Sequence, residues 1–122
     1  RIERGERPAV IRVGNLAAVR DFSDVRDVAR YLQVVGSQSA GGEVFNLCSG
    51  RAFSIRQVLN ILLAQARVPI RVEVDANRFR PLDNPQILGD CRSIRSRFGL
   101  RPEFPIEKTL LDLLDYWRES PR

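Results

Sequence analysis

The tripeptide Arg20-Asp21-Phe22 has the residue types in this chain that best suit ligand binding. An apolar run at residues 9–13 precedes it and ends at Gly14-Asn15, a pair typical of turns. Asp24, which follows, is typical of a helix N-cap. Arg20 is therefore predicted on an extended segment between two rigid elements, where its guanidinium could bind an anion. On spacing alone, an exposed ion pair beside a core phenylalanine, worth about 0–1 kcal/mol, is the simpler interpretation.

A second pair of charged residues, Arg80 and Asp83, lies in a stretch that contains two prolines. Pro81 and Pro85 favour an extended backbone at residues 77–85, because the residue before a proline is forced into β or polyproline II geometry. The stretch is predicted to be neither helix nor strand and to present both charges on a stiff loop. The alternative is an ordinary proline-rich connection with solvated charges.

The sequence lacks residues that most catalytic and metal sites require. It contains no histidine, which excludes Ser-His-Asp and Cys-His arrangements. Its two cysteines cannot supply the four ligands of a common structural zinc site. Cys48 and Cys91 are predicted to be small buried apolar residues, and a disulfide between them is the less favoured alternative. No pair of carboxylates is suited to acid–base chemistry, so we predict no catalytic residue and no metal site.

Length and composition predict one soluble domain. The 122 residues can bury one core, and no apolar run approaches the roughly 18 residues that span a membrane. The charged N-terminus is unlike a signal peptide. We therefore expect a cytoplasmic protein without a membrane partner. The absence of methionine indicates a processed piece or a fragment of a longer polypeptide.

The net charge of +5 arises from nineteen arginines and one lysine that are spread along the chain. A nucleic-acid-binding module more often has a basic run or stripe with stacking aromatic residues. Here apolar residues and prolines interrupt the densest basic stretches. Small anionic ligands are therefore at least as compatible with this composition as nucleic acid.

Alternating strand and helix patterns predict an α/β fold with short strands and about four helices. Apolar runs predict strands at residues 9–13, 43–47 and 70–74. The predicted helices run from Asp24 to about Val35, onward from a Ser54–Gln57 capping box, from Asp90 to Gly99, and onward from Pro105. Residues at helical spacing form the apolar face predicted for the first helix: Val25, Val28, Leu32 and Val35.

Eight segments, in order and at matching spacing, resemble the C-terminal half of extended short-chain dehydrogenases/reductases of the NAD-dependent epimerase/dehydratase family. They are Val13-Gly14-Asn15-Leu16, residues 20–28, residues 42–50, Ser54-Ile55, Arg80-Pro81-Leu82-Asp83, Leu88-Gly89-Asp90, residues 98–102 and Leu114-Asp115-Tyr116-Trp117. Within that family the pattern is most similar to GDP-6-deoxy-4-keto-mannose reductases and GDP-mannose 4,6-dehydratases. The resemblance covers nearly the whole chain.

This resemblance implies that residues 1–122 are a single, small, C-terminal substrate-binding domain. In the family this domain accompanies a Rossmann domain that binds NAD(P), and the implied substrate is a GDP-linked 6-deoxyhexose or mannose. Guanidinium groups suit the diphosphate because they bind phosphate oxygens in pairs. The binding residues that the resemblance implies are Arg20 and Arg80 for the diphosphate, Asp83 for the ribose, and Val13, Gly14 and Asn15 near the base.

Two motifs of the family are missing from the chain. The glycine-rich cofactor fingerprint is absent, and so is the catalytic Tyr-x-x-x-Lys pair, because Tyr31 and Tyr116 are followed four residues later by Val35 and Ser120. We therefore expect a fragment that binds no cofactor by itself and is not catalytic alone. The alternatives are a small basic module that binds nucleic acid and a non-catalytic interaction module. Self-association is also expected, because a substrate domain without its partner domain exposes apolar surface.

Overall fold

The fold is that of a computed structural model, which describes residues 1–39, 41–79 and 84–120. This part of the chain is α/β, with four helices and short strands, as predicted. The helices are α1 (Val25–Gln38), α2 (Ile55–Ala64), α3 (Arg92–Phe98) and α4 (Ile106–Glu119), with single 3-10 turns η1 (Ile2–Arg4) and η2 (Ala76–Arg78). The strands are β1 (Val10–Val13), β2 (Val19–Asp21), β3 (Ala52–Ser54), β4 (Arg71–Val74) and β5 (Gln86–Ile87).

The strands form two small sheets. β1 pairs in parallel with β4, which places Val13 opposite Val74. β2 is the middle strand of the other sheet, antiparallel to β3 and parallel to β5. Arg20 therefore lies on an extended segment between β1 and α1, as predicted, but this segment is the central strand of a sheet, where Arg20 is opposite Phe53 and Ile87. The difference arises because partners on both sides pair with the backbone of residues 19–21.

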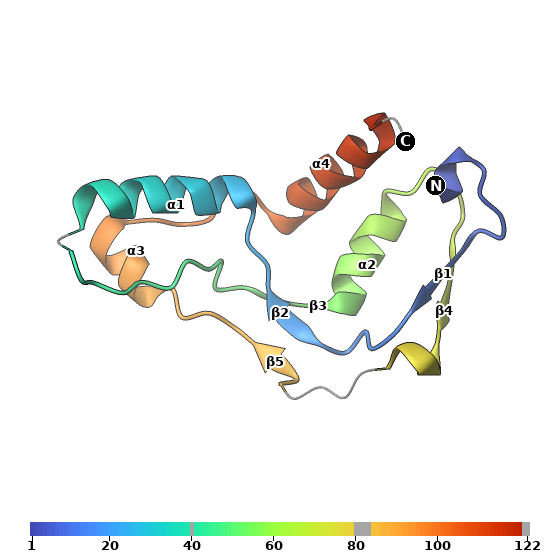
Figure 1. The fold of residues 1–122 in the computed structure, drawn as a ribbon, viewed down its shortest axis with the longest axis horizontal. Coiled ribbons are helices and arrows are strands. Elements are labelled where there is room, and N and C mark those ends of the chain that lie inside the picture. Colours follow the sequence, from blue (N-terminus) through green and yellow to red (C-terminus); the bar gives the residue numbers. More distant parts are fainter. Residues whose placement is uncertain (40, 80–83, 121–122) are drawn as a thin grey trace.

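The molecule is elongated, with helices gathered toward both ends of the sheets. α1 and α3 lie at one end, while α2, the β1–β4 pair and the chain termini lie at the other (Figure 1). α2 packs beside α4, and the three-stranded sheet occupies the middle. Within the described ranges, no helix has the length and apolar character needed to cross a membrane.

The main core cluster lies between α1 and α3. Tyr31 of α1 and Ile94 of α3 are almost completely buried, and Leu100 packs with them. Cys48 and Cys91 complete this cluster as free, buried thiols, which confirms their prediction as small apolar residues. Burial raises the pKa of the Cys48 thiol to about 11, so the thiol is neutral at physiological pH.

Three of the predicted helix-end signals are confirmed, whereas α3 has Cys91 and not Asp90 as its N-cap residue and α1 continues past Val35 to Gln38. Asp24 caps α1 by accepting the backbone N–H of Arg26, and Ser54 and Gln57 form the complete capping box of α2. Gly99 ends α3 with φ of 68°, the left-handed geometry that glycine adopts without strain. Such signals depend on residues close in sequence, which is why the sequence reveals them.

Two segments differ from their predictions. Residues 43–47, predicted as a buried strand, form no strand, because no described segment pairs with their backbone. Phe45 and Leu47 do pack against the core, but Val44 is 90% exposed. The stretch 77–85, predicted to be irregular, begins within the 3-10 turn η2, which Asp75 caps through the N–H of Asn77.

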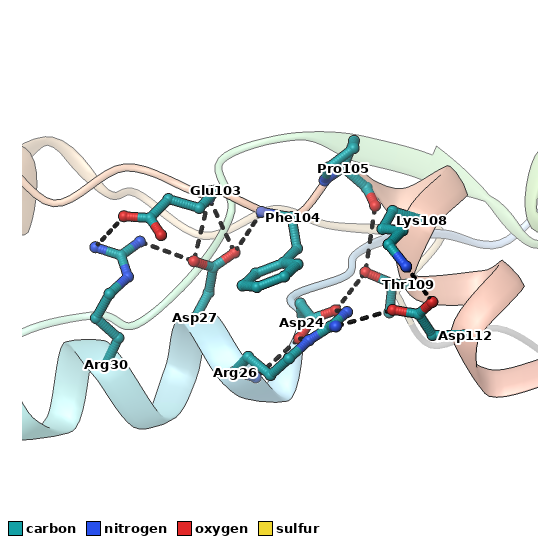
Figure 2. Close-up of polar contacts among 10 residues, drawn as sticks. All are labelled: Asp24, Arg26, Asp27, Arg30, Glu103, Phe104, Pro105, Lys108, Thr109 and Asp112. Atoms are coloured by element: carbon teal, nitrogen blue, oxygen red, sulfur yellow. Dashed lines mark hydrogen bonds and ion pairs between the residues drawn. The ribbon is translucent and has the colours of Figure 1, made fainter. Parts of the chain in front are cut away.

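The buried side of α1 also differs from the predicted apolar face. Val25 and Leu32 are 77% and 58% exposed, whereas Asp27 and Tyr31 are buried. The reason lies far away in sequence, because the carboxylate of Asp27 accepts the backbone N–H groups of Glu103 and Phe104 at 3.1 Å (Figure 2). A buried carboxylate is tolerated when donors satisfy it in this way.

Arg30 forms an ion pair with Asp27. Its guanidinium donates to the Asp27 carboxylate at 2.8 Å and also pairs with Glu103 at 3.2 Å. Burial by itself raises the pKa of Asp27, but the bonds from Arg30 and from the two backbone N–H groups outweigh it and the pKa is lowered. The carboxylate is therefore ionised and joins α1 to the segment that enters α4.

A second carboxylate, Asp24, joins the first turns of α1 and α4. It accepts the Thr109 hydroxyl at 2.6 Å and the Arg26 guanidinium at 2.7 Å. The same guanidinium reaches Asp112 at 2.8 Å and lies 3.8 Å from the centre of the Phe104 ring (Figure 2). Bonds from Arg26 and Thr109 hold the pKa of Asp24 well below its usual range.

Replacing Asp27 with asparagine should destabilise the chain strongly. The amide cannot neutralise Arg30, and its NH2 group would face backbone N–H donors. We expect a loss of about 3 kcal/mol in unfolding free energy, the magnitude for breaking a buried ion pair. Asp112→Asn is the control, because that carboxylate is partly exposed and its loss should cost about 0–1 kcal/mol. Urea unfolding of both variants measures this, and equal effects would contradict a structural role for Asp27.

Candidate functional site

Arg20 is half-buried and forms no ion pair with any described carboxylate. Its Nη1 atom donates only to backbone carbonyl oxygens, those of Val19 at 2.7 Å and Pro85 at 3.4 Å. Two of the other half-buried arginines differ, since Arg30 and Arg118 each bind a carboxylate at 2.8 Å, whereas Arg95 donates to the backbone carbonyl oxygen of Ser49 at 2.9 Å. The charge of Arg20 is therefore available for an anionic ligand.

The predicted base-side residues gather at the end of β1. The carbonyl oxygen of Val13 accepts the N–H of Asp75 at 2.8 Å, and the side-chain oxygen of Asn15 accepts the N–H of Ala17 at 2.8 Å. Gly14 does not have a positive φ. Glycine is required there for a different reason, since a β-carbon would overlap the carbonyl oxygen of Arg78.

Arg80 and Asp83 lie outside the described residues, but the residues that flank them are placed. Arg78, before the gap, packs its backbone against Gly14. Pro85, after it, accepts the N–H of Val19 at 2.9 Å and the guanidinium of Arg20. The two predicted regions thus contact described residues that precede and follow residues 80–83 in the sequence: Gly14 contacts Arg78, and Arg20 contacts Pro85. These links use backbone atoms, so side-chain patterns in the sequence could not have revealed them.

A cavity in the described part of the chain lies elsewhere. It has a volume of about 440 Å³, and its walls come from η1, β1, α2 and α4, with Leu59, Leu62 and Leu114 among its lining residues. Its lining is mainly apolar, and none of the predicted binding residues contributes to it. We therefore assign the candidate site to the surface around Arg20 and Gly14, where cationic and backbone groups can bind an anion. The described residues contain no cluster of three or more possible metal ligands.

Comparison with known proteins identifies the family. The family model described as GDP-mannose 4,6 dehydratase matches residues 1–113. The chain belongs to this family. It is 30% identical, over its whole length, to the GDP-6-deoxy-D-mannose reductase of Pseudomonas aeruginosa, and it covers 40% of that protein.

Two solved structures have a similar fold. The structure of RMD from Pseudomonas aeruginosa complexed with NADPH matches 96% of the chain with a TM-score of 0.88 and 28% identity. A putative epimerase from Burkholderia cenocepacia matches 92% with a TM-score of 0.83 and 35% identity. The chain spans 38% and 37% of these two proteins. The fold is thus that of one part of a larger family member.

Replacing Gly14 with alanine should destabilise the chain and separate β1 from η2. The new methyl group would meet a backbone oxygen that cannot rotate away, and overpacking of this kind costs about 1–3 kcal/mol. Gly36→Ala is the matched control. It lies within α1 with nothing near its added methyl group, so alanine should be neutral or stabilise by roughly 0.5–1 kcal/mol. Urea unfolding should give opposite signs for the two variants, and a neutral Gly14→Ala would contradict the close approach.

Proposed function

We propose that this chain is the GDP-sugar-binding part of an NAD(P)-dependent nucleotide-sugar reductase or dehydratase. The substrate is a GDP-linked 6-deoxyhexose or mannose. The observation that carries the proposal is the guanidinium of Arg20, which is held on a central strand without a carboxylate partner among the described residues. Membership of the GDP-mannose 4,6-dehydratase family supports the choice of nucleotide sugar.

The proposed roles follow the chemistry of each group. The diphosphate carries negative charge, and guanidinium forks bind its oxygens in pairs, which suits Arg20 and Arg80. A carboxylate accepts two neighbouring hydroxyl groups, which suits Asp83 to the ribose. Val13, Gly14 and Asn15 contact the base partly through the backbone at the end of β1.

The chain binds its substrate but does not perform the reaction alone. It contains neither the glycine-rich fingerprint nor the Tyr-x-x-x-Lys pair. The Pseudomonas protein was solved as a complex with NADPH, and the chain spans 38% of it. We therefore assign NAD(P) binding and proton transfer to the part of the enzyme that corresponds to the rest of such relatives.

Replacing Arg20 with alanine should weaken GDP-mannose binding by roughly ten- to a hundredfold. This corresponds to the loss of charge-assisted hydrogen bonds worth about 1.5–3 kcal/mol. Lysine should restore only part of the affinity, because it has the charge without the planar fork. The same loss is expected for Arg80→Ala. Isothermal titration calorimetry on the full-length protein that contains this chain measures each affinity.

Arg97→Ala is the matched control for this experiment. It also removes an arginine, but one on α3 that faces solvent and pairs with Glu43 at 3.5 Å, so GDP-mannose binding should be unchanged. Unchanged affinity in Arg20→Ala would contradict the proposed function. Binding that falls steeply with salt and does not distinguish GDP-mannose from an oligonucleotide would instead support the nucleic-acid alternative.

Alone, the chain should self-associate through apolar side chains that the described residues leave uncovered. Val25 and Leu32 lie exposed on α1, and Val44 is exposed nearby in the sequence. Because burying such surface is favourable, two copies should cover it with each other. Light scattering after size-exclusion chromatography should give a mass above 13.9 kDa, and Val25→Lys with Leu32→Lys should restore the monomer. A monomeric parent chain with a concentration-independent melting temperature would contradict this.

A further inference from the structure

Asp21, the residue after Arg20, has a carboxylate that accepts four hydrogen bonds. One oxygen accepts the backbone N–H of Ser49 at 2.9 Å and the Ser49 hydroxyl at 2.5 Å. The other accepts the N–H groups of Gly50 at 2.9 Å and Gly89 at 3.3 Å. Both oxygens are therefore satisfied by groups far away in the sequence, and three of the four donors are backbone amides.

These donors come from both sides of β2. Ser49 and Gly50 lead into β3, which is paired with one edge of β2, and Gly89 follows β5, which is paired with the other. The Asp21 carboxylate thus joins the end of β2 by hydrogen bonds to the segments next to both neighbouring strands. Each strand contributes only two or three residues, so the backbone ladders alone give little restraint.

The two glycines are needed for this arrangement. Gly50 has φ of 70°, and a β-carbon on it would overlap the thiol of Cys91. A β-carbon on Gly89 would overlap Cys48. Only glycine lets these two segments approach the core closely enough to turn their N–H groups toward Asp21. The four hydrogen bonds to Asp21 therefore depend on the close packing that Gly50 and Gly89 allow beside β2.

Asp21 makes no ion pair with an arginine among the described residues. Its negative charge is satisfied by amide and hydroxyl donors, which leaves the adjacent Arg20 guanidinium without a carboxylate. The carboxylate can therefore fix the backbone of Arg20 without occupying its side chain. An amide or an alkyl side chain at residue 21 could not accept four hydrogen bonds.

We propose that Asp21 is a positioning residue, which holds β2 so that the Arg20 guanidinium faces the diphosphate of the nucleotide. This rests on the proposed function of Arg20. The ligand class is a nucleoside diphosphate, and Asp21 acts on it through Arg20 without touching it. A residue of this kind should matter for diphosphate binding only while Arg20 is present.

A double-mutant cycle on the full-length protein tests this dependence, with GDP as the probe in calorimetry. Asp21→Asn should weaken GDP binding by about tenfold, because its NH2 group opposes the N–H donors and misplaces Arg20. In an Arg20→Ala background the same substitution should weaken binding by less than about twofold, because nothing is left to position. Equal losses in both backgrounds, or no loss in either, would overturn the proposal.

Two further variants keep the test decisive. Asp90→Asn is the matched control, because its exposed carboxylate bonds only to neighbouring Arg92, and GDP affinity should not change. Ser49→Ala removes the hydroxyl donor to Asp21, together with the acceptor of the Arg51 N–H, and leaves the three backbone donors in place. It should weaken binding by about two- to threefold in the parent, which covers the case that Asp21→Asn fails to fold. Unchanged GDP affinity in Ser49→Ala as well would then overturn the proposal.

The failure of the proposed function is distinguishable from the failure of the positioning role. Unchanged GDP affinity in Arg20→Ala would refute the proposed function itself. Weaker GDP binding in Arg20→Ala together with unchanged GDP binding in Asp21→Asn would refute only the positioning role of Asp21.

Discussion

Hydrogen bonds to ionised carboxylates join elements of this protein that share little apolar surface. Few apolar side chains are buried in the described residues: Leu16, Ala18, Tyr31, Cys48, Cys91, Ile94, Leu100 and Leu110. Most of them serve one cluster between α1 and α3. Several of the remaining junctions use carboxylates that accept several donors each, and charge-assisted bonds of this kind are stronger than neutral ones. Asp27 fixes α1 to the start of α4, and Asp21 fixes β2 to both neighbours.

A carboxylate also joins distant elements near the N-terminus. Glu3 of η1 accepts the Arg118 guanidinium at 2.8 Å and the N–H of Arg67 at 2.9 Å. Bonds from Arg118 lower the pKa of Glu3 to about 2. Arg4, in the same turn, donates to carbonyl groups at the end of α4, including that of Arg118 at 2.8 Å, and to that of the C-cap residue Ser120 at 2.9 Å. A cation is favourable there because the carbonyl ends of a helix carry partial negative charge. The N-terminal turn is thus joined to α4 almost entirely by charged groups.

This dependence explains which features the sequence predicted. Caps at Asp24 and Ser54 join residues two or three positions apart, so residue type and spacing suffice to find them. Asp27 binds N–H groups more than seventy positions away, and no local pattern distinguishes it from a solvated first-turn acid. Residues 43–47 have the composition of a strand, but a strand also needs a partner, and that partner cannot be inferred from the segment itself.

In the candidate site too, local sequence signals could be read from the sequence, whereas contacts between distant residues could not. Arg20 is a candidate because of its motif, whereas its place on a central strand and the bonds made by Asp21 depend on contacts with distant backbone. The arginines of α1 and α4 have their charges matched by nearby carboxylates, as Arg26, Arg30 and Arg118 do. The Asp21 carboxylate, next to Arg20, accepts three backbone N–H groups and one hydroxyl. The hydrogen bonds of Asp21 are therefore satisfied, whereas Arg20 has no carboxylate partner among the described residues. A guanidinium with no carboxylate partner among the described residues can still bind an anion, and this supports the proposal that Arg20 is a binding group.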